Sequence, residues 1–178
     1  MNRVKSNEHT YGRVAATIHW LSAALIIIML ISGFRAGSAV DPAEKLELLR
    51  LHMPLGIVVL LLTAARILWW WEFDNKPKPI AMPRWQSLVA SSVHTLLYIV
   101  ILGMAVSGIG MIALSGAGSI IAGESSEALP NFWDYLPRKP HGIGARVMLA
   151  LFVLHAGAAL YHHFVAKDSS LRRIWFTK

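Results

Sequence analysis

Five histidines stand inside, or at the edge of, long apolar stretches of this chain: His19, His52, His94, His141 and His155. A polar side chain in a membrane interior is costly unless it has a partner, so each of these positions indicates function before it indicates packing. Imidazole nitrogens are common ligands of metal ions and of haem iron. The five histidines therefore predict a metal or haem centre held between apolar helices.

His141 and His155 belong to the same apolar stretch, and their spacing places them on one face of a helix. They are 14 positions apart, which at about 100° and 1.5 Å per residue gives nearly the same direction and roughly 21 Å along the axis. One histidine would then lie near each membrane surface. Two stacked haems, each with one ligand from this helix, would use both.

Four stretches are apolar and long enough to cross a hydrocarbon core of roughly 30 Å as helices. We expect an all-α integral membrane four-helix bundle, a single domain over residues 1–178 with helices at about 14–34, 51–71, 87–114 and 142–166. SGAGS at 115–119 is expected to end the third helix. No internal repeat is evident. Because the chain has no cysteine, a covalent haem or an iron–sulfur cluster on thiolates is excluded, and any haem must be the non-covalent b type.

The net charge of +7 is spread between and beyond the apolar stretches. No basic helix of the kind that follows a phosphate backbone is present, which argues against nucleic acid and for a lipid bilayer as partner. Most of the basic residues fall in the two tails and in the connection between the second and third helices. By the positive-inside rule, both termini are expected to be cytoplasmic.

This topology gives each histidine a depth. His52 and His141 fall toward the outer side, and a haem between them is the simplest use of both. His19, His94 and His155 fall toward the cytoplasmic side. His155 is expected to ligate a second haem there, and its partner is either His19 or His94, which the residues alone do not separate.

Three further residues lie near the cytoplasmic side. Arg66 is expected to extend to the membrane surface as an anchor. His162 follows His155 by seven positions, about 20° short of two full turns, and should share its helix face. His163 is rotated by about 100° and should face headgroups or solvent.

The chain closely resembles the bacterial cytochrome b561 family over nearly all of its length. The likeness is carried by IHW at 18–20, ARILWW at 65–70, KPKP at 76–79 and, most specifically, LHAGAALYHHFVAKDSSLRR at 154–173. The resemblance implies a dihaem protein of the bacterial inner membrane that oxidises superoxide and reduces ubiquinone.

Carried over residue by residue, the resemblance makes His19 and His155 the axial ligands of the cytoplasmic-side haem b, and His52 and His141 those of the outer one. It thereby decides against His94 as a ligand. It also implies that His162 contacts ubiquinone near the cytoplasmic-side haem. Arg146 departs from the family, which usually has an uncharged residue there.

Two functions follow from this reading. In the first, superoxide gives electrons at the periplasmic face, and a cluster of cations steers that anion toward the outer haem; the cluster consists of Arg50, Arg138, Lys139 and Arg146. In the second, the protein is a non-catalytic cytochrome b subunit that links a dehydrogenase or a periplasmic redox partner to the quinone pool. A histidine-lined metal transporter is disfavoured, since the apolar stretches contain no acid to compensate a cation.

Overall fold

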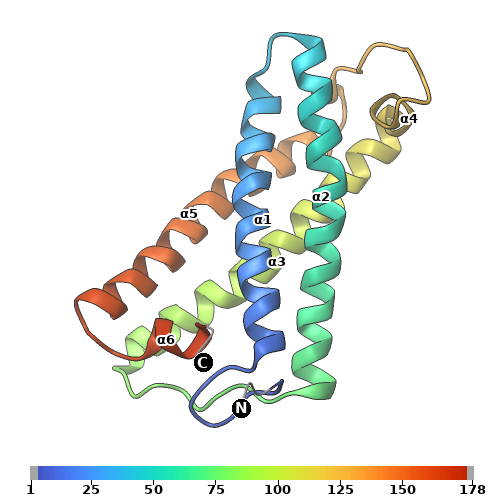
Figure 1. Ribbon diagram of the computed structural model, residues 1–178. Coiled ribbons are helices and arrows are strands. Elements are labelled where there is room, and N and C mark those ends of the chain that lie inside the picture. Colours follow the sequence, from blue (N-terminus) through green and yellow to red (C-terminus); the bar gives the residue numbers. More distant parts are fainter. Residues whose placement is uncertain (1–3, 176–178) are drawn as a thin grey trace.

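The computed structural model describes residues 4–175, and every regular element in this part of the chain is a helix. Four long helices dominate (Figure 1): α1 (Arg13–Ser38), α2 (Pro42–Leu68), α3 (Arg84–Ser115) and α5 (Arg138–Phe164). A π-helical turn at Trp69–Phe73 prolongs α2, and α4 (Ala117–Ala122), a 3₁₀ turn at Phe132–Asp134 and α6 (Ser170–Ile174) are short. All four long helices are apolar and long enough to cross a membrane, which confirms the predicted all-α membrane fold.

The long helices pack as two pairs, α1 with α2 and α3 with α5, and the pairs contact each other much less than their own members do. Both termini lie at one end of the bundle, and α4 lies at the other (Figure 1). We call these the terminal end and the α4 end. Side chains on α5 can therefore contact α3 within their own pair and, to a lesser extent, α1 of the other pair.

Helix α2 begins at Pro42, well before the predicted position 51. The Asp41 carboxylate caps it by accepting a hydrogen bond of 3.0 Å from the backbone N–H of Ala43, and Pro42 suits the first helical position. The prediction followed the charge-free stretch, whereas the helix extends beyond it through a charged segment. Helix α5 likewise starts at Arg138 rather than 142, because Pro140 is tolerated in a first turn.

The connection between α3 and α5 is more ordered than a loop. Gly116, with a φ of 67°, ends α3 inside the predicted SGAGS segment, and the chain then enters α4 at once. Ala117 and Ile121 of α4 are buried together with Phe132. This small cluster packs against the start of α2 and closes the α4 end.

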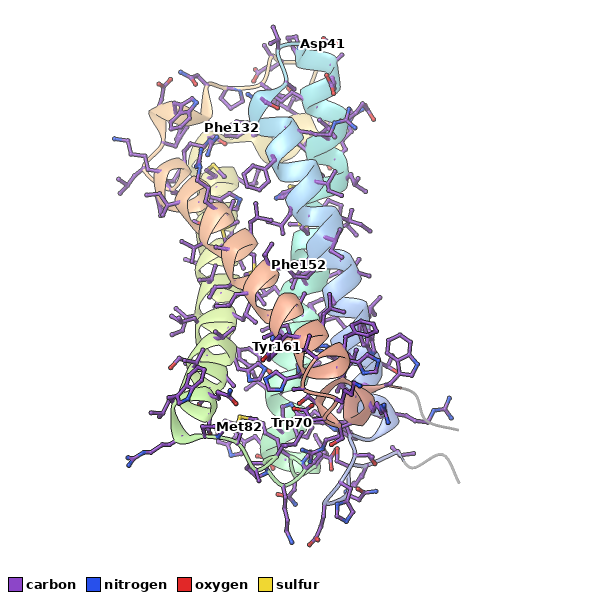
Figure 2. The ribbon with its side chains drawn as sticks, turned by 90° about the vertical axis from the view of Figure 1, so that its left-hand side faces the viewer. Asp41, Trp70, Met82, Phe132, Phe152 and Tyr161 are labelled. Carbon is purple, nitrogen blue, oxygen red and sulfur yellow. The ribbon has the colours of Figure 1, made fainter. Side chains whose placement is uncertain are left out.

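The membrane-spanning part has few buried side chains of its own. Large apolar residues such as Leu61, Val106 and Val153 are exposed, as expected of surfaces that face lipid. The most completely buried side chains in the described residues are small, such as Ala15 and Ala117, and no large one is less than 2 % exposed. Figure 2 shows the side chains between the two helix pairs, with Phe152 at mid-height.

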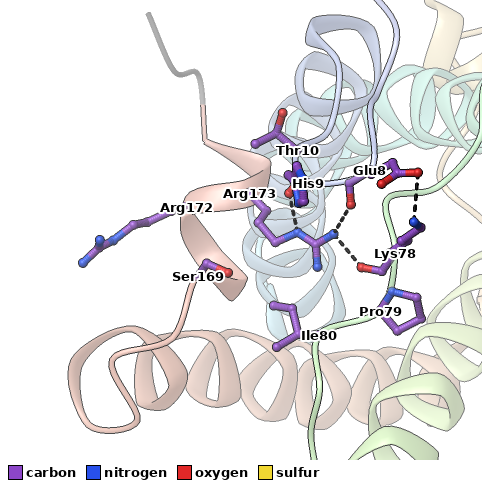
Figure 3. Close-up of a pocket in the computed structure, with 9 residues that line it drawn as sticks. All are labelled: Glu8, His9, Thr10, Lys78, Pro79, Ile80, Ser169, Arg172 and Arg173. Atoms are coloured by element: carbon purple, nitrogen blue, oxygen red, sulfur yellow. Dashed lines mark hydrogen bonds and ion pairs between the residues drawn. The ribbon is translucent and has the colours of Figure 1, made fainter.

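Two side chains fasten the terminal end. Asp74, which is buried, accepts hydrogen bonds from the Ser6 hydroxyl at 2.8 Å and from the Trp69 indole at 3.0 Å. The Arg173 guanidinium donates to the carbonyls of Glu8, His9 and Lys78, beside a cavity of about 400 Å³ (Figure 3). The N-terminal segment, the connection between α2 and α3, and α6 are thereby joined. The last three residues of the basic C-terminal tail, 176–178, lie outside the described residues.

Candidate functional site

At the α4 end, His52 of α2 and His141 of α5 face each other across the two helix pairs. Their ring centroids are 6.2 Å apart, with 73° between the ring planes. His52 lies in the first half of α2 and His141 in the first turn of α5. We call these two residues the α4-end pair.

The hydrogen bonds of His141 determine which of its ring nitrogens is free. Its Nδ1 lies 3.2 Å from the carbonyl oxygen of Met104 and 3.0 Å from the Ser107 hydroxyl. A carbonyl only accepts hydrogen bonds, so Nδ1 must carry the proton. Nε2 of His141 then keeps its lone pair, which is the state that can ligate a metal.

His52 has the same arrangement on the opposite helix pair. Its Nδ1 lies 3.0 Å from the Ser32 hydroxyl, and that hydroxyl donates to the Met29 carbonyl at 3.3 Å. Because the hydroxyl proton of Ser32 is used on the carbonyl, its oxygen accepts from Nδ1 of His52. The Ser107 hydroxyl donates in the same way to the Met104 carbonyl, at 3.0 Å.

A glycine follows each serine and makes room for the histidine ring. A Cβ atom on Gly33 would lie 2.8 Å from Cε1 of His52, and one on Gly108 would lie 3.3 Å from Cε1 of His141. The motif Met-x-x-Ser-Gly thus occurs at 29–33 and again at 104–108, once for each histidine. The sequence analysis did not identify this repeat, although the pentapeptides MLISG and MAVSG share three of their five residues.

Three histidines gather at the terminal end. The ring centroids of His19 and His155 are 6.1 Å apart, and those of His94 and His155 are 5.2 Å apart. Nη1 of Arg66 lies 3.2 Å from Nδ1 of His19. We call these four residues the terminal-end cluster. Arg66 is directed at the histidines, so the expectation that it is only a surface anchor is wrong.

His162 follows His155 by seven positions and lies in the last turn of α5, where it has an acidic partner. Its Nδ1 is 2.5 Å from Oδ2 of Asp168, and Oδ1 of the same carboxylate accepts from the backbone N–H of Ser170 at 2.8 Å. Partial burial acts to raise the pKa of Asp168, but the hydrogen bonds from Ser170 and His162 outweigh it, so the pKa lies below the usual value. His163, which was expected to face headgroups or solvent, is half-buried, and its Nδ1 is buried without a hydrogen-bond partner among the described residues.

The four predicted steering cations differ in their partners. Arg138 and Arg146 approach each other at Gly142, where Arg146 donates to the carbonyl at 2.8 Å, and Arg138 also stacks on Trp133. Lys139 is exposed beside them. Arg50 instead pairs with Glu47 at 2.7 Å and donates to the carbonyl of Ile121, which partly neutralises it.

The model of the prokaryotic cytochrome b561 family matches residues 10–177, which is nearly the whole chain. The chain belongs to this family. The cytochrome b561 homolog 1 of Escherichia coli K12 is 28% identical over 92% of this chain and 96% of its own length. A cytochrome b562 of Cereibacter sphaeroides is 29% identical over 95% and 97%, and a protein named "probable superoxide oxidase" of Yersinia pestis is 29% identical over 92% and 94%.

Cytochromes b561 are membrane electron-transfer proteins that bind haem b, and the histidine pairs suit that group. Two metal–imidazole bonds of about 2 Å on opposite sides of one metal separate the ring centroids by roughly 6 Å, close to the 6.1 Å and 6.2 Å observed. The 5.2 Å between His94 and His155 is too short by this measure. Among residues 4–175, no group of three His, Asp or Glu side chains is placed to hold a metal ion.

Proposed function

We propose that this cytochrome b561 holds two haems b and carries electrons across the membrane, from superoxide at the periplasmic face to ubiquinone at the cytoplasmic face. His52 and His141 hold one haem, and His19 and His155 hold the other. The observation that carries the proposal is the presence of two histidine pairs, one at each end of the bundle, with centroid distances of 6.2 Å and 6.1 Å. When bound, each haem iron accepts and releases one electron. The histidines hold the irons between the two helix pairs.

The sidedness of the proposal rests on charge. The basic tails and the connection between α2 and α3 share the terminal end, so this end is cytoplasmic by the positive-inside rule. The α4 end is then periplasmic. For this direction of transfer, the α4-end pair faces the electron donor and the terminal-end cluster faces the acceptor. The membrane is accordingly the bacterial inner membrane.

At the periplasmic face, the reaction is the loss of one electron from superoxide, which leaves molecular oxygen. Arg138 and Arg146 meet beside Gly142, directly after His141, and the exposed Lys139 adds a third positive charge. Positive charge at the mouth of a site raises the arrival rate of an anion. Arg50 contributes less, since Glu47 pairs with it. The likeness to a protein named "probable superoxide oxidase" supports this choice of donor.

At the cytoplasmic face, ubiquinone takes up two electrons and two protons to become ubiquinol. His162 is suited to supply protons, because it lies near water in the last turn of α5 and its Nδ1 is held by Asp168. The carboxylate accepts from Nδ1, so Nε2 is the nitrogen that can take up a proton from water and donate it to a quinone carbonyl oxygen. The pair thus orients one histidine for proton delivery.

The test is stopped-flow mixing of the purified, haem-loaded protein with superoxide, with and without a ubiquinone analogue. We expect superoxide to reduce the haems on the timescale of stopped-flow mixing. With the ubiquinone analogue present, the protein should turn over continuously and form quinol. Haem spectra that superoxide does not change, in a protein that dithionite reduces fully, would exclude the proposed donor. One haem per chain would exclude the dihaem arrangement.

A second function is favoured by one feature of the α4 end. Trp133 and Leu136 are 62% and 83% exposed on the segment between α4 and α5. Exposed apolar side chains of this kind suit a docking surface, and a non-catalytic cytochrome b subunit that links a dehydrogenase to the quinone pool would need one. In that case superoxide would reduce the haems slowly, and a partner would reduce them quickly.

A further inference from the structure

Arg66 lies on α2 within the span, about two turns before the end of the π-helical turn at Trp69–Phe73. Its side chain is half-buried, and its Nε is buried without a hydrogen-bond partner. Among residues 4–175, no carboxylate oxygen lies within 4.0 Å of its guanidinium, since none of the ion pairs found there includes it. A positive charge is therefore held at membrane depth without a protein anion.

This arrangement is costly as it stands. A guanidinium keeps its charge at any ordinary pH, and a buried charge needs a counter-ion and acceptors for its N–H groups. Among residues 4–175, the side-chain hydrogen bond found for Arg66 is with Nδ1 of His19 at 3.2 Å, and there the guanidinium must be the donor. Arg66 therefore still lacks an anionic acceptor for its remaining N–H groups, including the buried Nε.

Binding of a haem to His19 would remove even this contact. A donor on Nδ1 leaves the proton of the neutral imidazole on Nε2, and a protonated Nε2 cannot ligate a metal. When Nε2 of His19 ligates iron, Nδ1 carries the proton and repels the donors of Arg66. The guanidinium then needs another acceptor in the same place. Haem b carries two propionate groups, and a carboxylate matches the planar fork of a guanidinium.

We propose that Arg66 binds a propionate of the haem held by His19 and His155, and that its charge raises the reduction potential of this haem relative to the haem at the α4 end. A nearby positive charge favours the reduced state, which carries one positive charge fewer, and the effect is strong at low dielectric. This inference rests on the proposed dihaem function.

Among residues 4–175, no cation is hydrogen-bonded to a ring nitrogen of the α4-end pair. His52 and His141 are hydrogen-bonded to Ser32 and Ser107, which are neutral. Two cations lie near this pair on α5. Arg138 is half-buried, but it stacks on Trp133 and, among the described residues, makes no hydrogen bond to a histidine ring, whereas Arg66 contacts His19. Arg146 is exposed, so solvent and salt screen it. Arg66 therefore favours the electron on the haem at the terminal end, which is the direction that quinone reduction at that end requires.

The experiment compares Arg66→Gln and Arg66→Lys with the wild type, by anaerobic spectroelectrochemical titration of both haems. Arg66→Gln should lower the terminal-end potential so that its equilibrium with the α4-end haem shifts at least tenfold, which is 59 mV for a one-electron couple. The α4-end potential should stay unchanged, and Arg66→Lys should retain most of the wild-type difference. Arg84→Gln, which removes an exposed cation at the same end, is the matched control and should change neither haem.

A second measurement separates binding of the propionate from a general effect of charge. The apoprotein is reconstituted with haem b or with its dimethyl ester, in which both propionates are blocked. The ester should lower the occupancy or the potential of the terminal-end haem in the wild type and should have a smaller effect in Arg66→Gln, because the two changes remove the same contact.

Two results would overturn the inference: an unchanged terminal-end potential in Arg66→Gln with both haems bound, or an ester effect of equal size with and without Arg66. If Arg66→Gln holds no haem at the terminal end, the ester comparison in the wild type decides, and an ester that binds there as well as haem b would contradict the inference. A wild type with only one haem would instead contradict the proposed function.

Discussion

At the α4 end, two histidines face each other between two serines and two glycines; at the terminal end, three histidines gather around an arginine. The α4-end pair repeats one device on α1 and α3, in which a serine accepts from Nδ1 and the next glycine makes room for the ring. The terminal-end cluster repeats nothing, and its polar contact comes from the charged Arg66. The comparison indicates that the first site is built to hold two rings in fixed orientation.

The terminal end is better suited to handling charge. Besides Arg66 it contains the contact between His162 and Asp168, and within residues 4–175 no histidine at the α4 end has a carboxylate partner. A site that only passes single electrons needs orientation, whereas a site beside a quinone also needs protons. The asymmetry of the two ends thus agrees with donor and acceptor reactions that differ in their need for protons.

The largest expected effect comes from removing one ligand of the α4-end pair. His52→Ala or His141→Ala should abolish the α4-end haem and leave the other spectrally intact, because the iron would lose one of the two imidazoles that hold it. Haem content per chain, from the pyridine haemochrome spectrum, should fall to about half. Loss of both haems from a folded variant would show that the two sites are not independent.

His94 tests the same pairing at the terminal end. His94→Ala should retain both haems, since its ring is too close to His155 to share an iron with it, whereas His19→Ala should lose the terminal-end haem. If His94→Ala loses that haem and His19→Ala retains it, then His94 and not His19 is the ligand that pairs with His155.

The second largest effect concerns protons at the terminal end. His162→Ala should leave haem content and haem reduction by superoxide unchanged and slow quinone reduction by roughly 100-fold, the usual contribution of a positioned general acid. His163→Ala is the neighbouring control and should slow it much less. Equal quinone reduction in His162→Ala and the wild type would remove the assignment.

Asp168→Asn should have a smaller effect of the same kind, roughly tenfold, because a carboxamide can no longer fix the orientation of His162 as an anion does. The lowered pKa of Asp168 gives the sign of its pH dependence. Its hydrogen bonds stabilise the folded state above the usual Asp pKa of about 4 and are lost only as the pH falls through the lower folded value. The wild type should therefore keep this stabilisation of the folded state at every pH above about 5. The free energy of unfolding of the wild type and of Asp168→Asn, measured as a function of pH, would test this.

The sequence predicted the parts of this comparison that depend on periodicity. The apolar stretches determined four spans, and the spacing of His141 and His155 placed a histidine at each end of α5. It did not predict the contacts of Ser32, Arg66 or Asp168. Ser32 and Arg66 meet their histidines from a neighbouring helix, so their roles depend on how helices are rotated against each other. Asp168 meets His162 only because the chain turns back after α5.

Glycine substitutions test the room that each ring needs. Gly33→Ala should lower the affinity for the α4-end haem by about 1–3 kcal/mol, a common cost of overpacking, because its Cβ would lie 2.8 Å from the His52 ring. Gly108→Ala should cost less, since the corresponding distance is 3.3 Å. Gly103→Ala on α3, with nothing within 4 Å, is the control and should retain full haem. Haem titration of the apoprotein would rank the three, and a Gly103 variant that loses as much haem as Gly33→Ala would contradict the steric explanation.

The smallest expected effect comes from the two serines, Ser32 and Ser107, that bond to the histidines of the α4-end pair. Ser32→Ala removes the hydroxyl bonded to Nδ1 of His52, whereas Ser107→Ala leaves Nδ1 of His141 its second partner, the Met104 carbonyl. One neutral hydrogen bond contributes about 1 kcal/mol, so Ser32→Ala should weaken α4-end haem binding by roughly fivefold, and Ser107→Ala by less. A histidine that loses an acceptor at Nδ1 is a poorer electron donor to iron, so the α4-end potential should rise in Ser32→Ala while the terminal-end potential stays fixed. Equal shifts in the two serine variants, or a shift at the terminal end, would show that these hydroxyls act on the fold rather than on the orientation of one ligand.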